Sequence, residues 1–266
     1  MTALFGTVDL LPCPTFETAF EAVVDGNVDR AVIPIENSLF GSVHANYDLL
    51  RENDVSIVGE LHLRIRHNLM APAGATLDRL IKVHSHPQAI GQCRSFLRQR
   101  IPHAEVIPSY DTAGAAKMVS TSARTDEAAI ASARAALEYG LTILAENIES
   151  NHRNYTRFLA LAREPRIRPT RNEPADPNWK TSLVYSMKEN VPGALFKSLA
   201  VFALRELDLF KIESRPLIGS PGSYLFYLDV EGSATDLPVE RALEHLMEIA
   251  SQLKVLGSYP RGTTVD

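Results

Sequence analysis

The sequence predicts an α/β protein with two α/β lobes, followed by a smaller domain of the ferredoxin-like class. Short apolar segments alternate with helical patterns through the first 163 residues, which is typical of helix-covered sheets. A proline-rich stretch at 164–180 then interrupts the pattern. The remaining residues give the order βαββαβ, which is the ferredoxin-like order.

Composition limits the class of protein. The chain has 266 residues, 45% of them hydrophobic, and a net charge of -5, so it can form more than one apolar core. No apolar run approaches the roughly 20 residues of a membrane helix, and the first twenty residues lack a signal-peptide pattern. We therefore expect a cytoplasmic protein. Cys13 and Cys93 indicate neither a disulfide framework nor a metal site, and the dispersed basic residues argue against nucleic acid as a partner.

The first lobe is expected to begin with a capped helix. Thr15 precedes an apolar stripe at helical spacing, and Gly26 ends it; the stripe is Phe16, Ala19, Phe20, Val23 and Val24. A buried strand is predicted at 31–33, a helix from Ser42, and a long alternating strand at 55–65.

The second lobe repeats this alternation. Strands are predicted at 81–84, 106–107, 128–131 and 141–144, and helices at 87–99, from Thr112, and between Ser132 and Gly140. The chain then returns through 156–162. The pattern predicts parallel sheets, arranged as two lobes that face each other across a cleft.

The proline-rich stretch is predicted to be a linker between two domains. Pro165, Pro169, Pro174 and Pro177 deny it backbone donors. The predicted domains are therefore 1–163 and 181–266, with the linker at 164–180. In the second domain we expect strands at 182–187, 210–217, 224–230 and 254–258, and helices at 192–207 and 238–253.

Five motifs in order give the chain a family resemblance. They are Pro34-Ile35-Glu36-Asn37-Ser38, Ser85-His86-Pro87-Gln88, Asn154-Tyr155-Thr156-Arg157-Phe158, Gly193-Ala194-Leu195 and Glu213-Ser214-Arg215-Pro216. Together they resemble the prephenate dehydratase family. The resemblance implies a two-lobed fold similar to type II periplasmic binding proteins, with a C-terminal ACT domain. It also implies conversion of prephenate to phenylpyruvate in phenylalanine biosynthesis, without a cofactor.

The chemistry of that reaction suits the residues of the third motif. Prephenate carries two carboxylates and a ring hydroxyl, so an enzyme must hold anions and help a poor leaving group depart. The resemblance makes Thr156 the catalytic donor to the departing hydroxyl. Arg157 could bind a carboxylate or form a structural ion pair, and Phe158 could line the site or pack in the core. On an extended strand, Thr156 and Arg157 point to opposite faces.

The first two motifs supply further candidates for substrate binding. Glu36, Asn37 and Ser38 follow a buried strand at its carboxyl end, although Asn37 or Ser38 could simply cap a helix. Ser85 is expected to cap the helix that starts at Pro87. Gln88 and Gln92 lie four residues apart on one helix face and border either the site or solvent. The histidines lack the spacing of a zinc site, so no metal is expected.

The resemblance implies that the last two motifs bind phenylalanine and regulate the enzyme. Gly193, Ala194 and Leu195 would form one wall of a phenylalanine site, and Glu213, Ser214, Arg215 and Pro216 a second wall across a subunit contact. The expected assembly is a homo-oligomer, a dimer or a tetramer. Two alternatives stay open: an arogenate dehydratase, and a non-catalytic ligand sensor on the same fold.

The start of the chain departs from the family pattern. Family members usually begin with a strand, a glycine-containing turn and a helix, and no such segment precedes Leu10 here. We therefore expect the first domain to lack its first βα unit.

Overall fold

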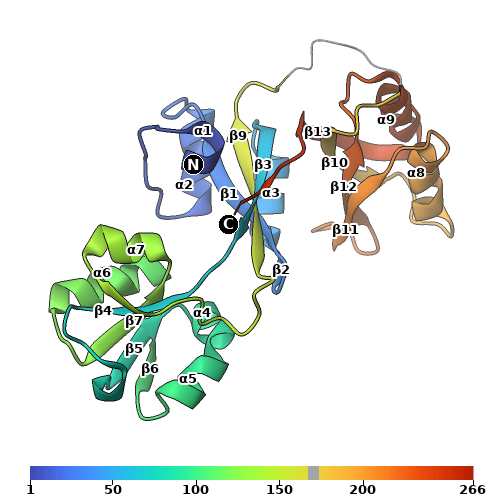
Figure 1. Ribbon diagram of the computed structural model, residues 1–266. Helices are drawn as coiled ribbons and strands as arrows, with labels where there is room; N and C mark the ends of the chain where they lie inside the picture. Colours follow the sequence, from blue (N-terminus) through green and yellow to red (C-terminus); the bar gives the residue numbers. More distant parts are fainter. Residues whose placement is uncertain (167–173, 266) are drawn as a thin grey trace. The chain divides into compact units, whose positions relative to one another are not determined.

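The computed structural model describes residues 1–166 and 174–265 (Figure 1). Its contacts form two compact units, one of residues 1–63 and 156–265 and the other of residues 64–155. Of the predicted linker at 164–180, residues 167–173 lie outside the described residues. The end of the predicted linker is wrong by two residues, because Trp179 and Lys180 already pair in a strand beyond the last proline. The described helices are too short or too polar to cross a bilayer.

One part of the first unit is a five-stranded sheet with three helices. The strand order is β14-β3-β9-β1-β2. The elements are α1 (Thr2–Phe5), α2 (Phe16–Val24), β1 (Ala31–Asn37), β2 (Gly41–Ser42), α3 (His44–Glu52), β3 (Ser56–Arg64), β9 (Tyr155–Ala162) and β14 (Thr264–Val265). The predicted cap of α2 is confirmed, since Thr15 accepts a hydrogen bond from the backbone of Thr18. The predicted start of α3 at Ser42 is wrong, because Ser42 pairs with Glu36 in the sheet and the helix begins at His44.

The prediction of parallel sheets is wrong in part, because both sheets combine parallel and antiparallel pairs. β9 runs antiparallel to β1, with Asn37 opposite Thr156 and Glu36 opposite Arg157. The chain leaves the first unit through β3 and returns through β9, so the returning strand runs against β1. This pairing places Thr156 and Arg157, the third and fourth residues of their motif, beside Asn37 and Glu36.

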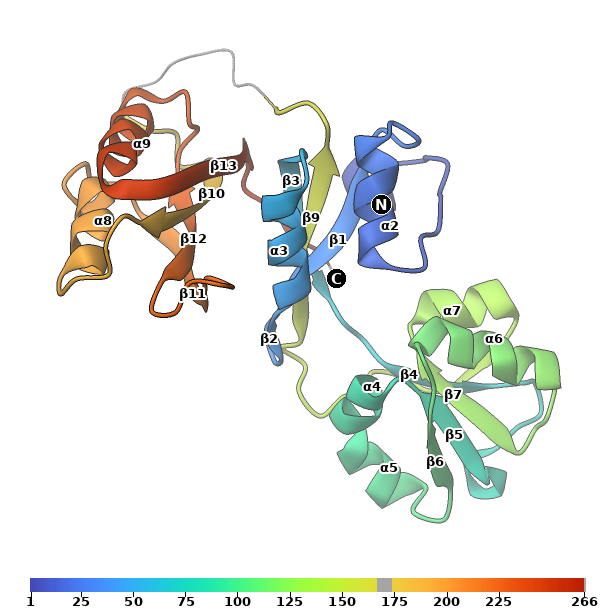
Figure 2. The same ribbon diagram turned by 180° about the vertical axis from the view of Figure 1, so that it is seen from behind.

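The second unit is a mixed sheet covered on both faces (Figure 2). Its strand order is β6-β5-β7-β4-β8. The elements are β4 (Asn68–Ala71), η1 (Leu77–Arg79), β5 (Lys82–Ser85), α4 (Pro87–Gln92), α5 (Arg94–Arg100), β6 (Glu105–Pro108), α6 (Thr112–Ser122), β7 (Glu127–Ala131), α7 (Ala133–Tyr139) and β8 (Thr142–Ala145). Leu97 and Ile101 belong to the core on one face, and Ala115 and Val119 to the core on the other. The single helix predicted at 87–99 is divided at Cys93, which leaves helical geometry.

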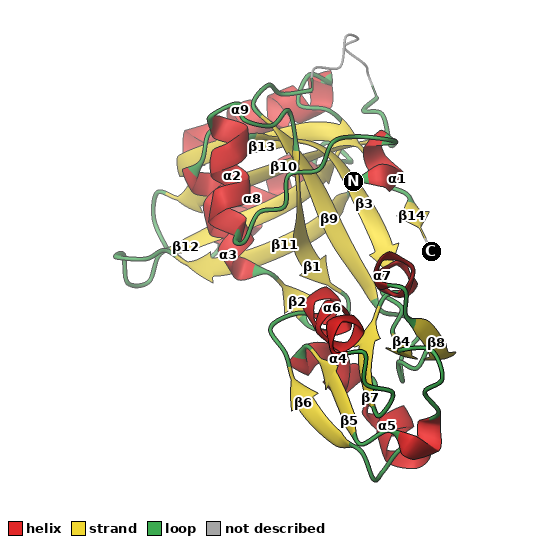
Figure 3. Ribbon diagram, turned by 90° about the vertical axis from the view of Figure 1, so that its left-hand side faces the viewer, coloured by secondary structure: helices red, strands yellow, loops and turns green. Residues whose placement is uncertain are grey.

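The C-terminal residues form an antiparallel sheet with two helices. Its strand order β11-β12-β10-β13 and the element order βαββαβ confirm the ferredoxin-like prediction. The elements are β10 (Trp179–Met187), α8 (Ala194–Ala203), β11 (Leu209–Pro216), β12 (Tyr224–Glu231), α9 (Leu237–Ile249) and β13 (Ala250–Pro260), the last running along the sheet in Figure 3.

The two faces of the C-terminal sheet bury different partners. Leu183 and Tyr185 pack with α8 and α9, which lie together on one face (Figures 1 and 2). Val184 and Tyr227 pack on the other face, in one core with residues of α2, α3 and β1. Because side chains alternate along a strand, β10 serves both cores. The C-terminal sheet is therefore packed directly on the part of the first unit that carries β1 and β9.

Candidate active site

Thr156 lies at the start of β9 and is held by the end of β1. Nδ2 of the Asn37 side chain donates a hydrogen bond to Thr156 Oγ1, with 2.9 Å between the two atoms. The same side chain accepts backbone hydrogen bonds from Leu39 and Phe40 through Oδ1, at 3.0 and 3.1 Å, which fixes the orientation of the amide. Asn37 thus joins the Glu36-Asn37-Ser38 motif to the Thr156 motif, as the pairing of their strands requires.

This contact orients the Thr156 hydroxyl as a donor. One lone pair of Oγ1 is used by Asn37, so the O–H of Thr156 is left to point elsewhere. Among the described residues, no acceptor is recorded for that O–H. Thr156 is 9% exposed, so a ligand that accepted this hydrogen bond would do so in a largely dry position. The geometry therefore leaves Thr156 with a proton to donate to a ligand oxygen.

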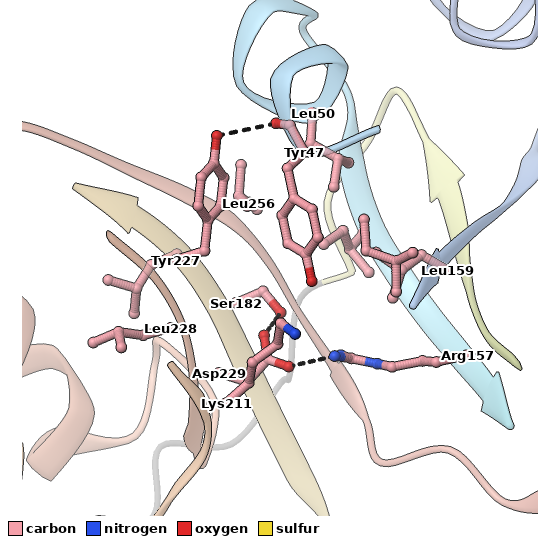
Figure 4. A pocket seen from close by; sticks show the side chains of 13 residues that line it. Tyr47, Leu50, Arg157, Leu159, Ser182, Lys211, Tyr227, Leu228, Asp229 and Leu256 are labelled. Atoms are coloured by element: carbon pink, nitrogen blue, oxygen red, sulfur yellow. Dashed lines mark hydrogen bonds and ion pairs between the residues drawn. The ribbon is translucent and has the colours of Figure 1, made fainter. Parts of the chain in front are cut away.

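Arg157 points to the other side of β9 and is engaged in buried ion pairs. Figure 4 shows the pair with Asp229. Its Nη2 and Nη1 lie 2.7 Å from Glu60 Oε2 and from Asp229 Oδ2, and Nη2 also donates to Tyr259 Oη at 3.0 Å. Lys180 Nζ is 2.8 Å from the second oxygen of Glu60. The cluster joins β3 and β9 to the C-terminal sheet.

The charges in this cluster support one another. Burial alone raises the pKa of Glu60, but Arg157 and Lys180 outweigh it and hold the pKa at about 2. Burial likewise opposes the charge of Arg157, yet Asp229 and the other anionic partners keep its pKa well above the ordinary value. Glu60 and Arg157 therefore both remain ionised at neutral pH.

The space beside Arg157 is too small for a substrate. The cavity drawn in Figure 4 has a volume of about 10 Å³, which is room for roughly one water molecule. Lys211, Tyr47 and Asp229 are among its lining residues. Arg157 could bind a substrate carboxylate only if these ion pairs opened, so that role stays a prediction. Phe158 is half-buried opposite Pro34, and its role also stays a prediction.

A second polar group surrounds Gln92 in the other unit. His67 Nε2 and Asn154 Nδ2 lie 2.5 and 2.8 Å from Gln92 Oε1. The backbone N–H of His67 donates to the buried carboxylate of Glu149 at 3.0 Å. Burial lowers the pKa of His67, although its hydrogen bond to Gln92 and the Glu149 charge act in the opposite direction.

The residues of the second motif lie near one another on β5 and α4. The expectation that Ser85 caps α4 is wrong: Pro87 is the first helical residue, so His86 takes the cap position and its Nδ1 accepts from the Gln88 backbone at 3.2 Å. Ser85 is buried at the end of β5 and donates to the Ile130 carbonyl at 2.7 Å. The Gln88 residue is exposed. Substrate binding by Ser85 and Gln88 stays a prediction.

The C-terminal candidates lie at two separate places. Gly193 caps α8 with φ +84, a left-handed conformation that favours glycine, and is followed by buried Ala194 and partly exposed Leu195. On β11, the Glu213 side chain accepts a hydrogen bond from the Ser42 hydroxyl.

Arg215 Nη1 lies 2.6 Å from Asp48. Ser214 and Pro216 are exposed on the alternate positions of the strand. The charged residues of this motif therefore contact α3 and β2 of their own chain. A phenylalanine site with these seven residues stays a prediction.

Metal ligands are not clustered in the part of the chain that the structure describes. No group of three or more His, Cys, Asp or Glu side chains there has the arrangement of a metal site. Cys93 is buried, which raises the pKa of its thiol to about 12.

Comparison with known proteins identifies the family. Residues 1–166 match the family model described as prephenate dehydratase. The chain belongs to the prephenate dehydratase family. It is 49% identical to arogenate dehydratase/prephenate dehydratase 2, chloroplastic, of Arabidopsis thaliana, over 97% of this chain and 68% of that protein.

Solved structures agree with this membership. The prephenate dehydratase of Arthrobacter aurescens in complex with L-Phe is 36% identical, with a TM-score of 0.84 over 94% of this chain and 81% of that one. GqqA, described as a novel type of quorum quenching acylase, is 37% identical, with a TM-score of 0.82 over 94% and 89%. The two-lobed fold with a C-terminal ferredoxin-like sheet is thereby confirmed. The chain spans 62 to 68% of the length of the curated plant relatives.

Several polar residues of these sites were not identified from the sequence. Glu60 and Asp229 lie on separate strands, and no spacing in the sequence links either of them to Arg157. His67 and Glu149 are also distant from Gln92 along the chain. Asn154 alone had a usable signal, since it opens the motif that contains Thr156.

Proposed function

We propose that this chain catalyses the decarboxylating dehydration of prephenate or arogenate. The ring carboxylate leaves as carbon dioxide, its bonding electrons enter the ring, and the ring hydroxyl leaves as water after taking a proton. The product is phenylpyruvate from prephenate and phenylalanine from arogenate. Prephenate is the substrate expected from the sequence.

The observation that carries the proposal is the Asn37–Thr156 pair. Asn37 occupies an acceptor position of Oγ1, so the hydroxyl keeps its proton for a ligand oxygen. A departing hydroxide is unstable in a dry site, and a donor placed at that oxygen stabilises the charge that develops on it. The family membership supports the same assignment. Glu36 and Ser38 flank Asn37 and are proposed to border the substrate.

Assays with each substrate separately test the proposal. We expect the protein to consume prephenate or arogenate with release of carbon dioxide and an aromatic product. Thr156→Val removes the hydroxyl at nearly constant volume, and Thr156→Ser is the matched control that keeps it. Loss of turnover in the first variant, with partial activity in the second, supports the assignment. A folded wild-type protein that turns over neither substrate refutes it.

The same assays separate other classes of function. One structural relative is described as an acylase, so hydrolysis of an N-acyl substrate should be measured beside dehydration. A sensor would bind prephenate or phenylalanine without consuming either. Activity toward an N-acyl amide that survived Thr156→Val would point away from the proposed site.

We propose further that L-phenylalanine binds the C-terminal region as a feedback inhibitor of a homo-oligomer. Support comes from the relative whose structure contains L-Phe and from Gly193 at the start of α8. Calorimetric titration of a preparation with a measured molar mass tests both points. Absence of binding to an oligomer would reject the regulatory proposal. Cytoplasmic localisation stays a prediction, because the Arabidopsis relative is named as chloroplastic.

A further inference from the structure

The Gln92 side chain is fixed through its oxygen. Oε1 accepts from His67 Nε2 at 2.5 Å and from Asn154 Nδ2 at 2.8 Å. Asn154 Nδ2 can only donate, so the opposite orientation of the amide would set N–H groups against N–H groups. With the oxygen of Gln92 facing both partners, the tautomer of His67 that fits carries its proton on Nε2. The amide therefore has one orientation, with its oxygen turned inward and its NH2 group turned away from both partners.

The NH2 group of Gln92 is available to a ligand. Among the described residues, no acceptor is recorded within hydrogen-bonding distance of Gln92 Nε2, and the side chain is half-buried rather than fully enclosed. Two N–H donors fixed in one direction suit an oxygen with several lone pairs, such as a carboxylate or a carbonyl.

The partners of Gln92 are themselves held in place. His67 is 6% exposed and Asn154 is fully buried. The backbone N–H of His67 donates to Glu149, and its carbonyl accepts from the N–H of Ile148 at 2.9 Å. Ser150, two residues after Ile148, donates its backbone N–H to the Gln92 carbonyl at 2.9 Å. The segment 148–150 thus holds both His67 and Gln92 in place through hydrogen bonds.

We propose that His67 and Asn154 are positioning residues that present the NH2 group of Gln92 to a carboxylate or carbonyl oxygen of the substrate. The proposal rests on the proposed function, because the oxygen-rich substrate is that of the dehydration. Without these two donors the amide can turn over, and its oxygen would then face the substrate oxygen. Binding would weaken through repulsion as well as through the lost hydrogen bond.

Substitutions at His67 test the positioning role. His67→Leu removes the donor, and His67→Gln keeps an N–H near the position of Nε2. We expect KM to rise about tenfold in His67→Leu, as for loss of a hydrogen bond to a charged group. The value of kcat should change less than about threefold, because the substrate and the transition state lose the same binding interaction. His67→Gln should recover most of the wild-type KM. The exposed His103, changed to Leu, is the control for loss of an imidazole elsewhere in the same unit.

Gln92→Glu separates orientation from shape. The variant keeps an oxygen for His67 and Asn154 but replaces the outward NH2 group by a second oxygen. We expect a rise in KM greater than that of His67→Leu, because a carboxylate would face the anionic substrate. Asn154→Asp, which removes the other donor, should also raise KM even if His67→Leu folds poorly. Melting temperatures identify any variant that fails to fold.

The outcomes distinguish the two proposals. Wild-type turnover with unchanged KM in folded His67→Leu and Asn154→Asp would overturn the positioning role and leave the dehydratase assignment intact. A fall in kcat alone, which His67→Gln did not restore, would also overturn it. Absence of wild-type turnover would refute the function on which the proposal rests.

Discussion

Replacing Glu60 by glutamine should show how strongly the buried ion cluster stabilises the first unit. The side chain is 1% exposed, so solvent does not screen its contacts with Arg157 at 2.7 Å and Lys180 at 2.8 Å. Its pKa is lowered from 4.5 to about 2 by those two charges, against the effect of burial. A difference of this size corresponds to about 3 kcal/mol of stability at neutral pH.

The pH dependence has a definite sign. The folded-state pKa of Glu60 is lower than the unfolded one, so the ionised carboxylate stabilises the fold above about pH 4.5. That contribution is lost as the pH falls from about 4.5 toward 2. Glutamine cannot ionise, so Glu60→Gln should be less stable by about 3 kcal/mol at pH 7 and should lose less stability on acidification.

Urea unfolding measured at several pH values between 7 and about 3 tests this expectation. Thermal unfolding at pH 7 should show a lower melting temperature, by roughly 6–12 °C for a unit of this size. Glu244→Gln, at an exposed position of α9, is the control for a lost carboxylate. Equal stability of Glu60→Gln and wild type at pH 7, or an identical slope with pH, would refute the electrostatic account of the cluster.

Three further outcomes are expected. Thr156→Val should lower kcat at least about a hundredfold, as for loss of a proton donor, with little change in melting temperature; comparable turnover in both proteins would contradict the assignment. Gly257→Ala should destabilise the fold by several kcal/mol, since its Cβ would lie 2.2 Å from the backbone oxygen of Ile57; a normal urea midpoint would show that the strands separate easily. A thiol reagent should modify Cys13 quickly and buried Cys93 only on unfolding; rapid reaction at both would show that the core around Cys93 opens.

Local patterns in the sequence determined most of the helices and strands. Alternation identified β3, the apolar stripe behind Thr15 identified α2, and βαββαβ order identified the C-terminal fold. These signals depend on neighbours within one element, so they can be read without the tertiary structure. The short strand β4 was not predicted, because it is buried throughout and its sequence does not alternate between apolar and polar residues.

Strand direction and the helix starts depended on longer-range contacts. The alternation of strands and helices cannot show that β9 returns between β3 and β1, which makes the sheet mixed. The start of α3 was displaced because Ser42 pairs with Glu36, a contact made by the sheet. A cap preference of about 1 kcal/mol does not outweigh such pairing.

The sequence by itself determined which residues are candidates for the chemistry, and the tertiary structure decided what each one contacts. The motif order pointed to Thr156 and Gln92, and the strand period placed Thr156 and Arg157 on opposite faces. Only the folded chain joined Arg157 to Glu60 and Asp229, which are 97 and 72 residues away along the chain (157 − 60 and 229 − 157). Ion pairs between such distant residues produce no periodic pattern in the sequence, because their geometry arises from the packing of whole sheets.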